Sequence, residues 1–517
     1  MILKIVMLVI FFAIMVGVGF YCRSKATDVR GFVLGGRSVG PWLTAFAYGT
    51  SYFSAVIFVG YAGQFGWRFG VASTWIGLGN AFIGSLLAWV ILGRRTRLMT
   101  QHLNSSTMPE FFGSRYDSKA LKLAASVIIF IFLIPYTASL YNGLSRLFGM
   151  AFNVPYEWCI IIMAVLTGVY VIAGGYMATA INDFIQGLIM LVGIVAVILA
   201  TLNINGGFIG SLTELAKVTD TAVSDAPGVF ASFFGPKPLD LLCVVILTSL
   251  GTWGLPQMVQ KFYAIKSEND ISKGTIISTI FAVIVAGGCY FLGGFGRLFE
   301  ADLAVVNGVP TGGYDAIIPT MMGKLPDFLM AIVIILVLSA SMSTLSSLVM
   351  ASSSTLTIDF IKYNIVKQMS EKKQVSCMRV LIVVFIAISA IIAILQYQYN
   401  VTFIAQLMGV SWGALAGAFL APFLYGLYWK KVSKASVWVC FIFGSGVMIL
   451  NMLAKSAFPQ SLQSPINCGA FAMLMGMIIV PVVSLFTKPI KKEITEDAFA
   501  CYNTKVTVSA KDALSDR

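Results

Sequence analysis

The chain has 517 residues and a formal net charge of +13, with 58% apolar and only 11% charged residues. Because a soluble protein carries roughly 25% charged residues, this composition excludes an ordinary soluble fold. Most basic residues stand in short segments between apolar runs. That arrangement is typical of membrane topology and argues against a nucleic acid as partner.

The apolar runs predict membrane-spanning helices. An α-helix needs about 20 apolar residues to cross a bilayer, whereas a membrane β-barrel shows short alternating segments. Thirteen spans are predicted, at 2–21, 42–66, 72–92, 120–149, 155–174, 178–201, 239–264, 272–297, 326–357, 376–397, 400–427, 434–454 and 467–487. The predicted fold class is an all-α polytopic membrane protein. We interpret the first run as a retained span, because it lacks a basic leader and a small-residue cleavage motif.

Lysine and arginine predict the orientation. They gather after alternate spans: Arg23, Lys25, Arg30, Arg37; Arg94, Arg95, Arg97; Lys266, Lys273; Lys362, Lys367, Lys372, Lys373; Lys430, Lys431, Lys434; and Lys488, Lys491, Lys492. The segment 202–238, on the other side, holds two lysines and three acidic residues. The positive-inside rule then places the N-terminus outside and the C-terminal tail inside. The polar tail from Glu493 to Arg517 is predicted to be disordered.

Several function classes lack their sequence signals. The eight cysteines include no CxxC pair and indicate buried or free thiols. No P-loop or dinucleotide fingerprint stands in a plausible context, which disfavours pumping driven by ATP. The segment GVSWG (409–413) fits a hydrolase nucleophile pattern, but it lies within a predicted span, far from the one histidine, His102. We therefore predict a protein that is not an enzyme.

Two predicted spans contain helix-breaking residues at matching places. The segment AFAYGTSYFSAVIFVGYAGQFG (45–66) has Gly49 beside several hydroxyl residues, and SLGTWGLPQMVQKF (249–262) has two glycines and a proline within six residues. Each span opens a block of five spans, 42–201 and 239–427. Because five is odd, the two blocks have opposite orientations, as in an inverted-repeat transporter. The alternative is that Gly and Pro are simply common in membrane helices.

Hydroxyl residues concentrate in SASMSTLSSLVMASSST (339–355), directly after an apolar run. Helical spacing puts four residues on one face, Ala340, Ser343, Thr344 and Ser347, with Ser346 beside them. Such oxygens suit a hard cation such as Na⁺, and backbone carbonyls freed around residues 50–53 would complete the site. Alternatively, these hydroxyls bond carbonyls of their own helix or join neighbouring helices.

Asp183 stands in GGYMATAINDFIQGLIMLVG (174–193), close to the start of an apolar span. An ionisable residue at membrane depth is a functional candidate. If it faced Ser346 and Ser347, its carboxylate would contribute to a second cation site. The alternative is that Asn182 or Asp183 caps the start of the helix.

Five motifs together resemble the sodium:solute symporter family. They are GGRSVGPWLTAFAYGTSYFSAVIFVGYAG (35–63), TMPEFF (107–112), GGYMATAINDFIQG (174–187), WGLPQMVQKF (253–262) and SASMSTLSS (339–347). They stand in the order and spacing of that family, and the resemblance covers about residues 5–487. It implies a LeuT-like core of two inverted five-helix repeats whose first helices are broken, with thirteen spans, the N-terminus outside and the C-terminus inside.

The resemblance also implies a domain organisation. The expected parts are an extra N-terminal helix and cytoplasmic loop (1–41), the first repeat (42–201), an extracellular loop (202–238), the second repeat (239–427), two C-terminal helices (428–487) and a cytoplasmic tail (488–517).

The sodium ligands of the family map onto this chain. They are the backbone carbonyls of Thr50, Phe53 and Ala340 and the side-chain oxygens of Ser343 and Thr344. Some members, including sialic acid transporters, have a second sodium site, whose pattern corresponds to Asp183, Ser346 and Ser347 here. The resemblance therefore allows one or two Na⁺ per solute, and it implies no organic cofactor.

The solute is predicted from the walls of the broken helices. Sugar-transporting relatives carry polar side chains where this chain has about Tyr52, Ile57, Pro256 and Val259. A sugar is disfavoured, because its hydroxyls would lose hydrogen bonds there. The motif GLPQ resembles the branch that handles pantothenate and short monocarboxylates. We expect a small carboxylate, or an amino acid such as proline, facing half-helix N-termini. The expected pocket residues are Ser51, Tyr52, Ser54, Trp253, Pro256 and Gln257.

The predicted function is sodium-coupled import of a small organic solute by alternating access. The protein is expected to act as a monomer in a plasma membrane, with the solute and the lipid bilayer as partners. The alternatives are a sodium/sugar symporter and a sensor or channel with the same fold. A channel needs a polar lining over several helices, whereas these hydroxyls concentrate on one, and a sensor usually carries a signalling domain.

Overall fold

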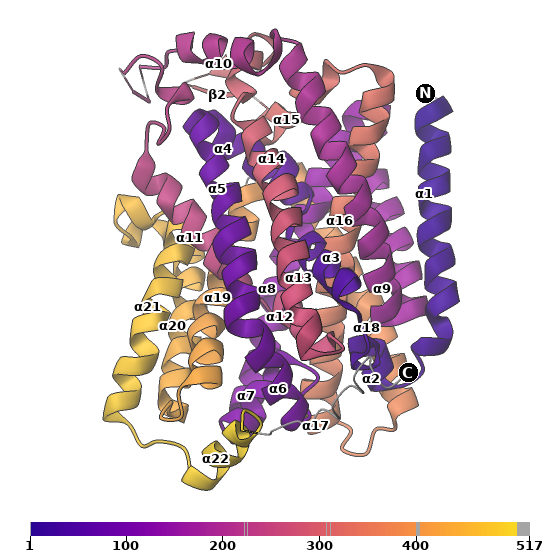
Figure 1. Ribbon diagram of the computed structural model, residues 1–517, viewed down its shortest axis with the longest axis vertical. Helices are drawn as coiled ribbons and strands as arrows, with labels where there is room; N and C mark the ends of the chain where they lie inside the picture. The colour runs from indigo at the N-terminus through magenta and orange to yellow at the C-terminus, as the bar shows by residue number, and fades with distance from the viewer. Residues whose placement is uncertain are drawn as a thin grey trace, which may run out of the picture.

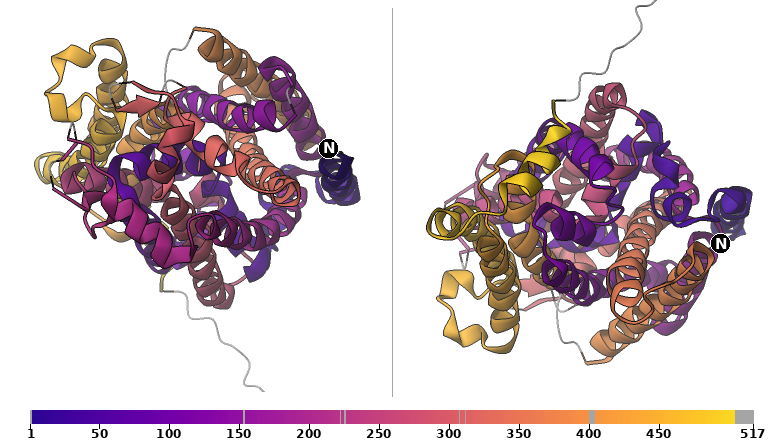
Figure 2. Two further views of the ribbon diagram at one scale, coloured as in Figure 1. Left: turned by 90° about the horizontal axis from the view of Figure 1, so that it is seen from above. Right: turned by 90° about the horizontal axis from the view of Figure 1, so that it is seen from below.

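The computed structural model describes residues 2–152, 154–221, 223–224, 226–306, 308–310, 312–399 and 404–503. These residues form a bundle of long helices that run mostly along the long axis of the molecule (Figure 1). The first helix, α1 (Ile2–Tyr21), stands at one edge of the bundle. The orange and yellow helices α20 (Lys434–Leu453) and α21 (Pro465–Phe486) stand at the opposite edge, as the end views also show (Figure 2).

Between these edges lie the remaining elements. Those of the first half are η1 (Cys22–Lys25), α2 (Val29–Leu34), η2 (Gly35–Arg37), α3 (Pro41–Tyr52), η3 (Val56–Tyr61), α4 (Ala62–Phe69), η4 (Gly70–Ser73), α5 (Thr74–Gly79), η5 (Asn80–Leu87), η6 (Trp89–Gly93), α6 (Arg94–His102), α7 (Met108–Arg115), α8 (Lys119–Phe152), α9 (Tyr156–Asn203), α10 (Gly207–Lys217) and η7 (Val229–Ala231). Those of the second half are α11 (Pro238–Gly254), α12 (Pro256–Ala264), α13 (Glu268–Ala282), η8 (Val283–Gly287), α14 (Gly288–Gly293), η9 (Gly296–Asp302), β1 (Val305–Val306), β2 (Val309–Pro310), η10 (Tyr314–Ala316), α15 (Ile317–Gly323), α16 (Asp327–Thr355), η11 (Leu356–Ile361), α17 (Lys362–Asn364), α18 (Glu371–Tyr399), α19 (Ile404–Tyr428), η12 (Lys455–Ala457), η13 (Gln460–Leu462) and α22 (Lys492–Ala500).

Ten helical segments of the described residues are long and apolar enough to cross a membrane, or up to eleven with the bent pair α11 and α12. Two predicted spans, 155–174 and 178–201, fall in the single 48-residue helix α9, which is longer than the roughly 20 residues that one crossing needs. Gly175, with φ +57° and ψ −151°, interrupts this helix between them. The exact count of thirteen crossings therefore stays a prediction.

Both expected helix breaks are present. α3 ends at Tyr52, and a helical conformation resumes only after Phe53 and Ser54. α11 ends at Gly254, and α12 begins after Leu255 with a bend of 46°. The two linking residues have almost the same backbone conformation, φ −83° and ψ 118° at Phe53 and φ −83° and ψ 123° at Leu255. An extended residue interrupts the helical hydrogen-bond series, so backbone groups at both breaks are available to other partners.

α16, which carries the hydroxyl stretch, lies in the interior of the bundle. It packs against α9, α8 and α3, and every residue from Val333 to Thr355 is buried. α1 lies at the other extreme, with most of its apolar side chains exposed on the edge of the bundle. The hydroxyls of α16 are therefore shielded by protein on all sides.

The end of α12 is fixed by the segment before α3. The Arg37 guanidinium donates hydrogen bonds to the backbone carbonyls of Tyr263 at 3.0 Å and Ser105 at 2.7 Å. Burial lowers the pKa of Arg37 to about 10, so the group is still a cation at neutral pH. This contact ties the second broken helix to the segments that flank the first.

The start of the C-terminal tail is ordered, and the prediction of disorder was wrong for residues 493–503. α22 buries Phe499 beneath the Arg115 guanidinium, 5.0 Å from the ring centroid. The Tyr502 hydroxyl donates to the backbone carbonyl of Leu427 at 3.2 Å. These two aromatic side chains anchor this short segment on the bundle. The rest of the tail, 504–517, lies outside the described residues.

Candidate functional site

Five buried oxygen atoms converge between the end of α3 and the middle of α16. They are the backbone carbonyls of Thr50, Phe53 and Ala340 and the hydroxyls of Ser343 and Thr344. The Ser343 hydroxyl lies 3.2 Å from the Thr50 carbonyl. The Thr344 hydroxyl lies 3.1 Å from the Thr50 carbonyl and 3.3 Å from the Phe53 carbonyl. The structure thus brings together all five groups predicted for the sodium site.

The hydrogen bonds of these two hydroxyls are long. A bond between a hydroxyl and a carbonyl is usually about 2.7–2.8 Å, and the closest contact of either group is 3.1 Å. In the same helix, Ser341 and Ser354 bond their own i−4 carbonyls at 2.8 Å and 2.7 Å. The alternative of bonding within the helix describes these two serines well. Ser343 and Thr344 also contact the Ala340 carbonyl of their own helix, at 3.2 Å and 3.1 Å, but unlike Ser341 and Ser354 they reach across to the end of α3 as well.

The neutral oxygen cluster can bind a small hard cation. Its carbonyl and hydroxyl dipoles present lone pairs at one point, in a region where all five contributing residues are 0% exposed. Such dipoles replace the hydration shell of an ion without adding a charge of their own. Because Phe53 is extended, the α3 carbonyls that take part are released from helical pairing by the break.

Asp183 lies inside α9, several residues past its break at Gly175. The alternative that Asp183 caps a helix start therefore does not hold, because the helix is continuous on both sides of it. The neighbouring Asn182 also takes no capping role, since its side-chain amide donates to the Met15 carbonyl at 3.2 Å. Asp183 is fully buried, so its charge requires compensation within the protein.

That compensation comes from Lys261 of α12. Its ammonium nitrogen lies 3.7 Å from the Asp183 carboxylate. It also donates a hydrogen bond to the Ser347 hydroxyl at 3.1 Å, and the Ser347 oxygen lies 2.7 Å from the Ser51 oxygen. Side chains from α9, α12, α16 and α3 therefore meet in one buried cluster, in which a lysine stands between the predicted second-site residues Asp183 and Ser347.

Ser346, the third residue of the predicted second site, donates to the Ser343 carbonyl of its own helix at 2.9 Å. The structure thus brings Asp183 and Ser347 together through Lys261, and it turns Ser346 elsewhere. Sequence reasoning missed Lys261. The signal was available, because a lysine within the predicted span 239–264 satisfies the same rule that singled out Asp183.

The six predicted pocket residues are all buried, and their polar groups divide into two sets. Ser51 is paired with Ser347, and the Trp253 indole donates to the Ile83 carbonyl at 3.0 Å. The polar atoms of Tyr52, Ser54 and Gln257 lack a hydrogen-bond partner among the described residues. Pro256 carries no side-chain donor or acceptor and forms the first residue of α12. An unpaired buried polar group costs about 1–3 kcal/mol, so the second set is suited to a polar ligand.

Two aromatic residues that sequence reasoning missed stand beside this set. The Trp412 ring of α19 lies 6.2 Å from that of Tyr52 and 5.9 Å from that of Tyr136 in α8. The Tyr136 hydroxyl and the Trp412 indole nitrogen are likewise buried and unpaired within the described part of the chain. Both occupy the middle of predicted spans, whereas anchoring aromatics gather at the membrane interfaces. That position was the available signal.

Residues 32–444 match the family model described as "Sodium:solute symporter family". The chain belongs to this family. It is 30% identical over 455 residues to "Sodium/proline symporter 2" of Staphylococcus saprophyticus, covering 86% of this chain and 85% of that protein. It is also 30% identical over 456 residues to the "Sodium/proline symporter" of Staphylococcus aureus strain COL, with the same coverage. The expectations of a transporter rather than an enzyme, and of this family, are confirmed.

The fold of this sodium:solute symporter has a solved counterpart. The chain is similar to a substrate-bound, outward-open structure of a Na⁺-coupled sialic acid symporter, with a TM-score of 0.74 and 17% identity. The similarity covers 95% of this chain and 99% of that one. The symporter is therefore a multi-pass membrane protein with a LeuT-like fold, as predicted.

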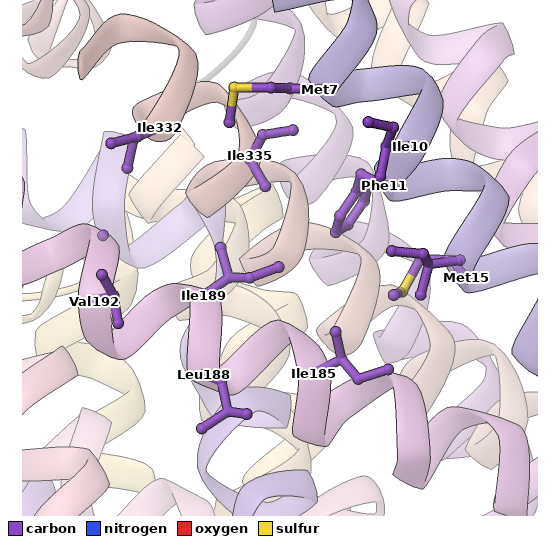
Figure 3. Close-up of a pocket in the computed structure, with 12 residues that line it drawn as sticks. Met7, Ile10, Phe11, Met15, Ile185, Leu188, Ile189, Val192, Ile332 and Ile335 are labelled. Carbon is purple, nitrogen blue, oxygen red and sulfur yellow. The ribbon is translucent and has the colours of Figure 1, made fainter. Parts of the chain in front are cut away.

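An apolar groove in the symporter lies apart from these polar clusters. It runs between α1, α9 and α16 and has a volume of about 480 Å³ (Figure 3). All twelve lining residues are apolar, among them Met7, Phe11, Ile189 and Ile335. The lining side chains of this groove carry no oxygen or nitrogen, in contrast to the polar residues at the breaks of α3 and α11.

Proposed function

We propose that this protein imports a small carboxylate-bearing solute together with Na⁺, by alternating access. The observation that carries the proposal is the convergence of five neutral oxygens from Thr50, Phe53, Ala340, Ser343 and Thr344 at the break after α3. In this proposal these atoms bind the coupling ion. Membership of the sodium:solute symporter family and the similarity to proteins named sodium/proline symporters support it.

The ion site and the break of α3 share the same residues, and this gives a route for coupling. A bound cation joins the Thr50 and Phe53 carbonyls to Ser343 and Thr344, so it holds α3 against α16. Binding favours conformations in which the two helices are close. A Na⁺ ion that crosses the membrane potential contributes about 2.3 kcal/mol per 100 mV, which can drive solute accumulation.

The solute in this proposal binds at the second break. α12 begins at Pro256, and the N-terminus of a helix carries about half a positive charge, which favours a carboxylate. The neighbouring unpaired groups of Tyr52, Ser54 and Gln257 supply hydrogen bonds to the rest of a small molecule. A monocarboxylate, a pantothenate-like compound or an amino acid such as proline fits these groups.

We also propose that residues 42–201 and 239–427 form two inverted repeats, and that the protein acts as a monomer. The matching backbone conformations of Phe53 and Leu255 support the repeats. The proposed orientation has the N-terminus outside. It is supported by the arginines of α6, which lie with α22 at the end of the bundle opposite the start of α1 (Figure 1).

Reconstituted protein tests this function. Liposomes that contain the purified chain are given an inward Na⁺ gradient, and uptake is measured for a panel of radiolabelled carboxylates, amino acids and sugars. We expect at least one carboxylate-bearing solute to accumulate, and accumulation to stop when Na⁺ is replaced by K⁺ or choline. Empty liposomes provide the control. Uptake that is indifferent to Na⁺ for every transported solute would refute the proposal, and uptake of sugars alone would refute the solute class.

A further inference from the structure

The cluster around Lys261 is more than one ion pair. The ammonium contacts the Asp183 carboxylate at 3.7 Å and the Ser347 hydroxyl at 3.1 Å, and it lies 5.1 Å from the centre of the Tyr176 ring. An anion, a hydroxyl oxygen and an aromatic face are three kinds of group that attract a cation. The lysine side chain is 3% exposed, so little water reaches the ammonium group to weaken these interactions.

The Asp183 carboxylate has charge compensation without hydrogen bonds. Neither of its oxygens has a hydrogen-bond partner among the described residues, and 3.7 Å is longer than a charge-assisted hydrogen bond. The lysine therefore serves this carboxylate as a nearby positive charge and not as a donor. A metal cation would serve it in the same way.

We propose that the Lys261 ammonium is a built-in cation that takes the place of a second coupling ion. The inference rests on the proposed Na⁺ symport and fixes its stoichiometry at one Na⁺ per solute. The ion from solution binds the five-oxygen cluster, while the side chain of α12 supplies the positive charge that Asp183 and Ser347 would otherwise obtain from a second Na⁺.

The Lys261 ammonium and a Na⁺ bound to Asp183 would repel each other. A Na⁺ bound to Asp183 with the lysine still in place would lie about 4 Å from its ammonium. At an effective dielectric constant of about 20, repulsion at that distance weakens binding roughly a thousandfold. Removing the ammonium removes this repulsion and leaves Asp183 as an uncompensated charge, which favours the entry of a second ion.

The experiment counts bound sodium, so it needs no solute. Binding of ²²Na⁺ to the purified full-length protein is measured to saturation in detergent. We expect one Na⁺ per wild-type protein, two for Lys261→Met, and one for Lys261→Met combined with Asp183→Asn, which has no carboxylate to fill. Gln260→Met is the matched control, because Gln260 is a buried polar neighbour on α12 that donates instead to the Val33 carbonyl at 3.1 Å. Gln260→Met is expected to bind one Na⁺.

The counts separate this inference from the proposed function. Two Na⁺ in the wild type, or a folded Lys261→Met that binds no more Na⁺ than the wild type, overturns the built-in cation. A wild type that binds none while Lys261→Met binds one supports the built-in cation and overturns the five-oxygen site. If Lys261→Met does not fold, the wild type and Asp183→Asn decide: one Na⁺ in both supports the inference, and a fall from two to one overturns it.

Discussion

Two clusters lie one helical turn apart on α16, and they differ in charge. The first joins Ser343 and Thr344 to backbone carbonyls of α3 and contains only neutral oxygens. The second joins Ser347 to Lys261 and Asp183 and contains one positive and one negative charge. In the proposed function the first cluster binds an ion from outside, whereas the second already contains its own positive and negative charge. Hydroxyls on a helix thus mark a polar site, and the neighbouring helices decide whether it is open to an ion.

The largest effect is expected from reversing one charge of the second cluster. Lys261→Asp places two carboxylates where an ion pair stood. Losing one partner of a buried pair costs about 3–5 kcal/mol, and the new repulsion adds to that. We expect little folded protein, measured by size-exclusion chromatography and thermal unfolding in detergent.

Exchanging both residues provides the matched control for this prediction. Lys261→Asp combined with Asp183→Lys keeps the two charges and reverses their positions, so it is expected to recover part of the lost stability. A single Lys261→Asp variant as stable as the wild type would show that the second cluster is not an ion pair in the folded protein.

A smaller effect is expected from the first cluster. Ser343→Ala or Thr344→Ala removes one of five oxygens. If each is worth about 1–3 kcal/mol, Na⁺ affinity falls roughly fivefold to 150-fold. The stability without Na⁺ should change little, because both hydroxyls make long hydrogen bonds. The measurement is the dissociation constant from ²²Na⁺ binding.

Ser341→Ala is the control within the same helix. Ser341 is equally buried and bonds its own Val337 carbonyl at 2.8 Å, away from α3. Its loss should leave Na⁺ affinity at the wild-type value. Equal losses of affinity in Ser341→Ala and Ser343→Ala would remove the distinction between hydroxyls that bond within the helix and hydroxyls that bind the ion.

The smallest effect is expected from Ser347, the residue of the second cluster that also contacts α3. Ser347→Ala removes the hydroxyl that links Lys261 to Ser51, at a cost of about 1 kcal/mol. It should lower the unfolding temperature by about one degree with no change in the Na⁺ count. Ser346→Ala removes a hydroxyl that bonds the Ser343 carbonyl within α16 and does not touch Lys261 or Ser51, so it is expected to change the unfolding temperature less. If Ser346→Ala lost a bound Na⁺, the Ser346 side chain would belong to an ion site. That result would contradict the proposal that the one Na⁺ binds the five-oxygen cluster.

The sequence predicted those features that depend on local composition. Runs of about 20 apolar residues predict helices, and Gly254 with Pro256 predicts a break, because these residues act on their own backbone. The resemblance to the family implied all five oxygens of the first cluster, and the geometry brings them together.

The features that were missed depend on contacts between distant segments. Lys261 meets Asp183 only because α12 packs near α9, and no local pattern reports that pairing. Tyr136 and Trp412 come from two other helices. The tail is ordered because Phe499 finds Arg115, more than 300 residues earlier in the chain. Sequence patterns identified Asp183 and the hydroxyls of α16, but not Lys261, the residue that pairs with Asp183.

The position of Ser347 has a mechanical consequence. Its one oxygen touches Ser51 on the first broken helix at 2.7 Å and Lys261 on the second at 3.1 Å. A hydrogen bond is lost once it is stretched by about 1 Å, so α3 and α12 cannot separate by more than this without releasing the serine from one of them. The presence of both hydrogen bonds therefore limits the distance between α3 and α12. Any conformational change that moves α3 away from α12 by more than this distance must therefore break one of the two hydrogen bonds of Ser347.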